Sequence, residues 1–65
     1  MNQAICNLIT GKREKEAIQD LNNFKCQWRI LMRDGEAPQN LTPDRNDQRY
    51  GLVIQDGVVV RVMPG

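Results

Sequence analysis

The sequence contains no histidine and only two cysteines, Cys6 and Cys26, in 65 residues. A four-ligand zinc site and a cysteine–histidine nucleophile pair therefore cannot be assembled from this chain alone. Spacing does not establish a disulfide, so a Cys6–Cys26 bridge and two reduced, half-buried thiols are both open alternatives. Asp44 and Asp47 are a candidate carboxylate pair, but no apolar run that could line a pocket accompanies them. We predict that the protein is not an enzyme and uses no metal or cofactor.

Aromatic residues are also few, and the three present form no stacking series: Phe24, Trp28 and Tyr50. Nine basic and eight acidic residues give a net charge of +1 without a basic stripe, which binding to nucleic acid through its phosphates would require. Long apolar runs are lacking, as is the basic and apolar start of a secretory signal. We expect a cytoplasmic protein that binds neither nucleic acid nor membrane, with a secreted protein as the alternative if a signal peptide has been removed.

A chain of 65 residues is too short for two hydrophobic cores, so we predict a single domain over residues 1–65. Residues 11–23 carry apolar side chains at helical spacing, and Thr10 is placed to act as the N-cap of this helix. The face that we expect to be buried consists of Ala17, Ile18, Leu21 and Phe24.

Three further segments have the pattern of strands. Residues 26–32 alternate between apolar and other side chains, and Trp28 is expected to pack under the helix. Residues 50–55 are apolar at nearly every position, which is typical of a central strand covered on both faces. Asp56-Gly57 then predicts a tight hairpin turn into a strand over residues 58–63. In that last strand three valines are expected on one side: Val58, Val60 and Val62.

Between the first two strands lies a polar segment of about seventeen residues, from Arg33 to Arg49, which contains Pro38 and Pro43. An unstructured segment of this length in a small domain is usually functional or disordered. It is also long enough to recross the sheet and so to join two parallel strands. We predict an α+β fold with one helix packed on a small mixed three-stranded sheet and a long exposed binding loop.

Five short motifs follow one another in this order along the chain. They are Leu8-Ile9-Thr10-Gly11-Lys12, Arg33-Asp34-Gly35-Glu36, Thr42-Pro43-Asp44 with Arg49 five residues later, the apolar Leu52-Val53-Ile54, and the closing Val60-Arg61-Val62-Met63-Pro64-Gly65. On these residues the chain resembles the potato inhibitor I family and the bacterial I78 peptidase inhibitor family. The resemblance covers most of the chain.

The resemblance implies a reactive loop that inserts into a serine protease as a slowly cut substrate. Its predicted residues are Leu41, Thr42, Pro43, Asp44 and Arg45, with Pro43 as the specificity residue and Asp44 following the reactive bond. The resemblance also implies that Arg49 braces the loop by donating hydrogen bonds to Thr42 and Asp44. Because Gly51 stands where plant members carry a second bracing arginine, Arg49 would act alone or with Arg45. Leu41 either contacts a partner or pins the loop.

These observations predict a small protein-binding module, with inhibition of a serine protease through the loop from Arg33 to Arg49 as the first hypothesis. Pro43 has no backbone N–H and a fixed φ, which makes it an unusual substrate mimic and keeps an unrelated target protein open. The alternative is a non-inhibitory structural or assembly protein that uses the same scaffold or the edge of its sheet, including formation of a homodimer.

Overall fold

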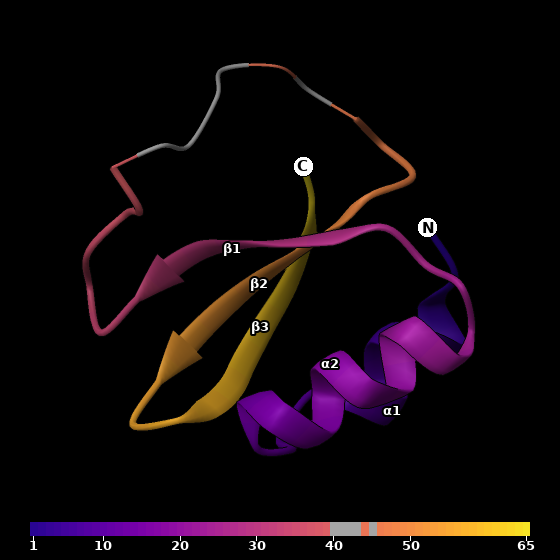
Figure 1. Cartoon of the computed structure of the whole chain (residues 1–65), viewed down its shortest axis with the longest axis horizontal. Coiled ribbons are helices and arrows are strands. Elements are labelled where there is room, and N and C mark those ends of the chain that lie inside the picture. The colour runs from indigo at the N-terminus through magenta and orange to yellow at the C-terminus, as the bar shows by residue number, and fades with distance from the viewer. Residues whose placement is uncertain (40–43, 45) are drawn as a thin grey trace.

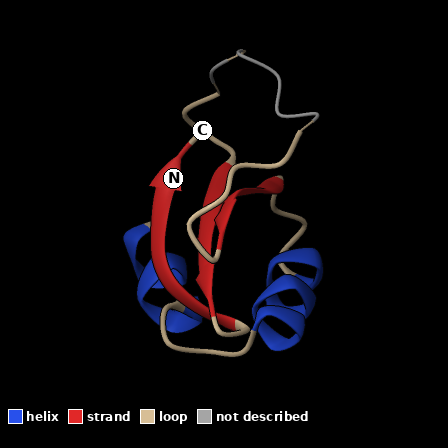
Figure 2. Cartoon of the chain, turned by 90° about the vertical axis from the view of Figure 1, so that its left-hand side faces the viewer, coloured by secondary structure: helices blue, strands red, loops and turns tan. Residues whose placement is uncertain are grey.

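The described part of the chain folds as two helices on one face of a three-stranded sheet, as seen in a computed structural model (Figure 1). The structure describes residues 1–39, 44 and 46–65. The elements follow in the order α1 (Gln3–Ile9), α2 (Glu14–Asn23), β1 (Trp28–Arg33), β2 (Tyr50–Gln55) and β3 (Val58–Pro64). β2 is the central strand, parallel to β1 and antiparallel to β3 (Figure 2). The predicted α+β class with a mixed three-stranded sheet is confirmed.

Helix α1 was not expected from the sequence. Asn2 caps it, since its side-chain oxygen accepts hydrogen bonds from the N–H groups of Ala4 and Ile5. The helix has seven residues, which is too short for a clear apolar period to show in the sequence. Thr10, which we expected to begin a helix, instead follows α1, and its N–H and hydroxyl both donate to the carbonyl of Cys6. The predicted N-cap is therefore wrong.

Helix α2 begins later than the apolar pattern suggested, at Glu14 after the N-cap Arg13. The later start places Glu14 and Glu16 in the first turn, where negative charge is favourable at the positive end of the helix dipole. Gly11 has φ +90°, a left-handed conformation that interrupts the chain between the helices.

The segment between the helices pairs with the edge of β3. Gly11 N–H donates to the Val59 carbonyl at 2.7 Å, and Val59 N–H donates to the Lys12 carbonyl at 2.9 Å. Glu14 N–H donates to the Gly57 carbonyl at 2.8 Å. These bonds join residues far apart in sequence, which explains why local helix propensity did not predict where α2 begins.

A single apolar cluster fills the space between the helices and the sheet. Its buried members come from both helices and from β2 and β3: Cys6, Ile9, Ala17, Leu21, Tyr50, Leu52, Ile54 and Val59. Trp28 packs against this cluster as predicted, and its indole N–H donates to Asn22 Oδ1 at 2.9 Å. Phe24, which was expected on the buried face, is 52% exposed because it lies just past the end of α2.

The predicted orientation of the valines in β3 is wrong because the strand contains a bulge. The register between β2 and β3 shifts between Val53 and Ile54, and Val60 is the residue that the pairing skips. Val59 is fully buried in the core, whereas Val60 is 48% exposed. A bulge of this kind reverses the side on which later residues lie, and strict alternation cannot reveal it.

The hairpin between β2 and β3 forms at the predicted Asp-Gly pair. Asp56 has φ +52° and Gly57 has φ +76°. Two successive left-handed residues are the signature of the type I′ turn, which matches the twist of the strands it joins. The prediction of a tight hairpin is confirmed.

No helix in the described part of the chain combines the length and the apolar character that crossing a membrane requires.

Candidate protein-binding loop

The candidate site is the segment that joins the parallel strands β1 and β2. Of its residues the structure describes 34–39, 44 and 46–49. Four predicted reactive-loop residues lie outside the described residues: Leu41, Thr42, Pro43 and Arg45. Asp44 and the predicted brace Arg49 are described, and the geometry of the site is built from them and from the residues that hold the two ends of the segment.

The segment leaves β1 through a second tight turn. Asp34 has φ +52° and Gly35 has φ +82°. Arg33 and Glu36 exchange two backbone hydrogen bonds across the turn, of 2.8 Å and 3.0 Å. Asp tolerates the left-handed region because its short side chain can make local hydrogen bonds, and Gly adopts it freely. The turn therefore has the same conformation as the one at residues 56–57.

Asp34 connects these two turns. Its N–H donates to the Ile54 carbonyl at 2.9 Å, and its Oδ1 accepts a hydrogen bond from the Asp56 N–H at 2.9 Å. Arg33 also forms an ion pair with Glu14 at the start of α2. We call the Arg33–Glu36 turn with its bonds to β2 and to Asp56 the turn anchor. It attaches the beginning of the loop to the hairpin end of the sheet.

Arg49 holds the other end of the loop. One of its terminal nitrogens, Nη2, donates to the backbone carbonyl of Asp44 and to its Oδ2, both at 3.2 Å. Its Nε donates to the Gly65 carbonyl at 2.9 Å. The Arg49 side chain is 17% exposed, so its position is largely set by its surroundings. The contact between Arg49 and Asp44 that the resemblance implies is present, and the implied contact to Thr42 lies outside the described residues.

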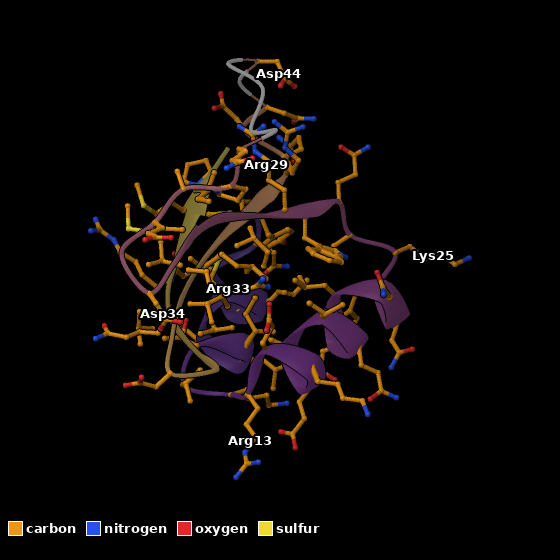
Figure 3. The ribbon with its side chains drawn as sticks, turned by 60° about the vertical axis from the view of Figure 1, so that its left-hand side comes forward. Arg13, Lys25, Arg29, Arg33, Asp34 and Asp44 are labelled. Atoms are coloured by element: carbon orange, nitrogen blue, oxygen red, sulfur yellow. The ribbon has the colours of Figure 1, made fainter. Side chains whose placement is uncertain are left out.

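A second arginine that the sequence did not single out also reaches Asp44. Arg29, on β1, places Nη1 3.4 Å from Asp44 Oδ1 and donates from Nη2 to the Asp44 carbonyl at 3.2 Å. Figure 3 shows Arg29 beneath Asp44 at the loop end of the molecule, well apart from Asp34. We call Asp44 with Arg29 and Arg49 the arginine anchor. In the sequence Arg29 was only a polar position in an alternating strand.

The register of the sheet explains why the second arginine comes from β1. Arg29 lies opposite Gly51, on the face of the sheet that the helices do not cover. A Cβ atom at Gly51 would lie 2.3 Å from Leu31 Cδ1 and 2.9 Å from the Met63 carbonyl. Real Cβ atoms do not approach neighbours this closely, so no side chain fits at position 51 without rearrangement. Position 51 of β2 therefore cannot carry an arginine, whereas Arg29 on the neighbouring strand β1 supplies a guanidinium.

Asn46 closes the loop next to the arginine anchor. Its backbone carbonyl accepts from the Arg49 N–H at 3.1 Å, and its Oδ1 accepts from the Gln48 N–H at 2.9 Å. Its Nδ2 donates to Gln27 Oε1 at 3.1 Å, just before β1. An Asn that bonds the backbone two residues on is a common way to fix a turn. Asn46 therefore fixes the turn that leads through Arg49 into β2.

The hydrogen bonds of this site hold the backbone and side chain of Asp44 in place. Two guanidinium groups meet one carboxylate and one backbone carbonyl, and charge-assisted hydrogen bonds of this kind are stronger than neutral ones. Asp44 is 57% exposed, so solvent screens its ion pairs and each is worth no more than about 1 kcal/mol. The bonds restrict rotation of the Asp44 peptide and side chain.

Both cysteines are free. Cys6 is buried in the core, and burial raises the pKa of its thiol because the charged thiolate loses hydration. Among the described residues, no group of three or more cysteine or carboxylate side chains is arranged to hold a metal ion.

Comparisons of the chain with protein-family models, curated proteins and solved structures found no match. The resemblance to the potato inhibitor I and I78 families therefore stays a prediction.

Proposed function

We propose that the protein is a small binding module that engages another protein through the loop between β1 and β2, and that a serine protease is the first target to test. The observation that carries this proposal is the arginine anchor. Arg29 and Arg49 hold Asp44 although neither arginine lies in the apolar core. Two largely buried arginines thus hold one exposed loop residue in place, and this supports a role for the loop in recognition.

Anchoring of the loop favours binding for a thermodynamic reason. Fixing the backbone of one residue costs about 1–2 kcal/mol of conformational free energy, and a flexible loop loses this on association. A loop that is already held loses less, so more of its contact energy becomes affinity. The turn anchor and the arginine anchor restrict the two ends of the segment before any partner arrives.

The proposal is tested by assaying the purified protein against subtilisin-like and chymotrypsin-like proteases. We expect tight, slowly reversed inhibition, weakened by Leu41→Ala and by Arg49→Met. Arg61→Met is the matched control, because Arg61 is an exposed arginine on the same face of the sheet and is not part of either anchor. If no protease in the panel is inhibited and none cuts between Thr42 and Asp44, the protease target is wrong.

Binding to an unrelated protein is tested by capture from cell extract. We expect partners that the native chain and Arg61→Met retain, and that Leu41→Ala and Arg49→Met lose. Equal retention by all four proteins would show that another surface binds, and the loop proposal would then fail.

The alternative, assembly through a sheet edge, has less support. Residues 11–14 already pair with the outer edge of β3. At the end of β1, the backbone N–H and C=O groups of Arg33 already bond to Glu36. Backbone N–H and C=O groups alternate in direction along a strand, so in β1 those of Trp28 and Ile30 point away from β2 and form the open edge. If two copies paired there with Trp28 opposite Ile30, the two Arg29 side chains would face each other, which is unfavourable. Sedimentation analysis tests this: a stable dimer abolished by Ile30→Pro would favour assembly.

The location in the cytoplasm remains part of this proposal. Fractionation of the source cells tests it, with the protein expected among the cytoplasmic proteins. Recovery from the medium would instead favour the secreted alternative.

A further inference from the structure

We propose that Arg29 is a positioning residue of the binding loop, which acts on a bound partner only through Asp44. The inference rests on the proposed function as far as a partner is concerned, whereas its effect on the loop can be measured on the free protein. The geometry that carries it is the division of Asp44 between two arginines. Arg29 approaches one carboxylate oxygen, Oδ1, and Arg49 approaches the other, Oδ2.

Contact with both oxygens has a different effect from contact with one. Rotation about the last side-chain bond of Asp44 moves both oxygens, so one arginine at one oxygen could follow the motion, whereas with an arginine at each oxygen both side chains would have to move. Arg29 and Arg49 also both donate to the Asp44 carbonyl, each at 3.2 Å. Two donors on one carbonyl restrict the orientation of that carbonyl. Arg29 therefore adds a second constraint on the backbone, in addition to a second charge.

Arg29 is well placed for this role because it projects from a strand. Its backbone pairs with Gly51 in the central strand, and its side chain is 20% exposed. Groups carried on regular elements are held more accurately than groups carried on loops. Arg49 directly precedes β2, so one guanidinium comes from β1 and the other from the residue before β2, and both reach Asp44.

The first experiment measures amide hydrogen exchange at Gln48 and Arg49, whose N–H groups are hydrogen-bonded to Asn46, in Arg29→Met, which keeps a long side chain but has no donors. We expect exchange there to accelerate about tenfold, since losing hydrogen bonds to a charged group changes a local opening equilibrium by that order. Exchange in α2 and β2 should stay within about twofold of the native protein. Arg61→Met is the control and should leave all of these rates unchanged. Equal acceleration throughout the molecule would mean that Arg29 only supports the fold, and the proposal would be overturned.

The second experiment tests whether Arg29 acts through Asp44. The Arg29→Met change is made in the native chain and in an Asp44→Ala chain, and its effect on exchange at Gln48 and Arg49 is compared. Interacting residues are non-additive in such a cycle. We expect most of the effect of Arg29→Met to be absent when Asp44 is alanine. An undiminished effect would show that Arg29 does not act through Asp44.

A third variant, Arg29→Lys, separates charge from geometry. Lysine keeps the positive charge but has no planar fork that can reach a carboxylate oxygen and a carbonyl oxygen together. We expect loop exchange between the rates of the native protein and Arg29→Met. Native-like exchange would show that charge alone suffices and would overturn the two-point constraint.

These outcomes are distinguishable from failure of the proposed function. If Arg29→Met loosens the loop through Asp44 but no partner is bound by the native chain, the positioning role stands and the binding proposal fails. If a partner is bound through the loop equally well by the native chain and Arg29→Met, the binding proposal stands and the positioning role fails.

Discussion

The two ends of the candidate binding loop are held in different ways. The turn anchor is built on consecutive residues, Arg33–Glu36, with a left-handed backbone at Asp34 and Gly35 and two local hydrogen bonds, and Asp34 links it to Ile54 and Asp56. The arginine anchor joins side chains that are far apart in sequence, namely Arg29, Asp44 and Arg49. The first end depends on backbone conformation, and the second depends on charge and on the register of the sheet. Different perturbations should therefore release each end separately.

Gly51→Ala should have the largest effect, and it should affect the arginine anchor more than the turn anchor. The new Cβ would collide with Leu31 and with the Met63 carbonyl. Overpacking of this kind costs about 1–3 kcal/mol in free energy of unfolding, measurable by denaturant titration. Because Gly51 lies opposite Arg29, exchange at Gln48 and Arg49 should rise while exchange at the turn anchor changes less.

Leu31→Ala combined with Gly51→Ala provides the control. Leu31 contributes the two closest contacts, and the backbone contact to Met63 remains. The added Leu31→Ala change should therefore cost less in the Gly51→Ala chain than in the native chain. Full additivity of the two changes would contradict the assigned clash.

The turn anchor should respond to Asp34→Ala. Alanine removes the acceptor for the Asp56 N–H and places an unfavourable side chain at φ +52°, which together cost about 1–3 kcal/mol. Thermal unfolding measures the loss. Asp34→Asn is the matched control, because asparagine keeps a side-chain oxygen and tolerates the left-handed region. If both variants lose equal stability, the charge of Asp34 matters instead of its hydrogen bond and conformation.

Salt should weaken the arginine anchor more than the turn anchor. At 1 M ionic strength the Debye length falls to about 3 Å, and ion pairs of a half-exposed carboxylate such as Asp44 are screened. Amide exchange at Gln48 and Arg49, next to the arginine anchor, should accelerate by a few fold between low and high salt, while exchange at Glu36 should change little. An equal response at both ends would remove the distinction between the anchors.

The smallest effect concerns Cys6, which lies in the core and belongs to neither anchor. Burial raises the pKa of the Cys6 thiol above the ordinary value of 9.0, so the unfolded chain ionises at lower pH than the folded one. This contribution to stability is complete below about pH 9.0 and is lost as the pH rises through the raised folded value. Denaturant titration from pH 8 to pH 10.5 should show a steeper loss for the native protein than for Cys6→Ala. A steeper loss in Cys6→Ala would contradict this assignment.

Strands and turns of this protein were the features most readable from sequence. The run over residues 50–55 and the Asp56-Gly57 pair predicted β2 and its hairpin, because a continuous apolar run and left-handed turn residues are both local signals. The same chemistry at Asp34-Gly35 was assigned to the loop and was not recognised as a turn. Helix α1 was missed because seven residues give too short a pattern.

The candidate site was predictable only in part. The motif around Asp44 and Arg49 suggested their contact, which is present in the structure. Arg29 was not suggested, since nothing in an alternating strand indicates which polar residue lies beside a distant loop. Leu41, Thr42, Pro43 and Arg45 lie outside the described residues, so their predicted roles stay predictions.

The sequence by itself determined the α+β class, the central strand and the Asp56-Gly57 turn, because each depends on neighbouring residues and on side-chain period. Only the tertiary structure decided the start of α2, the bulge at Val60 and the pairing of Arg29 with Gly51. These depend on register between strands and on hydrogen bonds across the chain, where a shift of one residue changes which side chains meet. The candidate binding loop needs both: a turn coded by adjacent residues at one end, and arginines brought together by the sheet at the other.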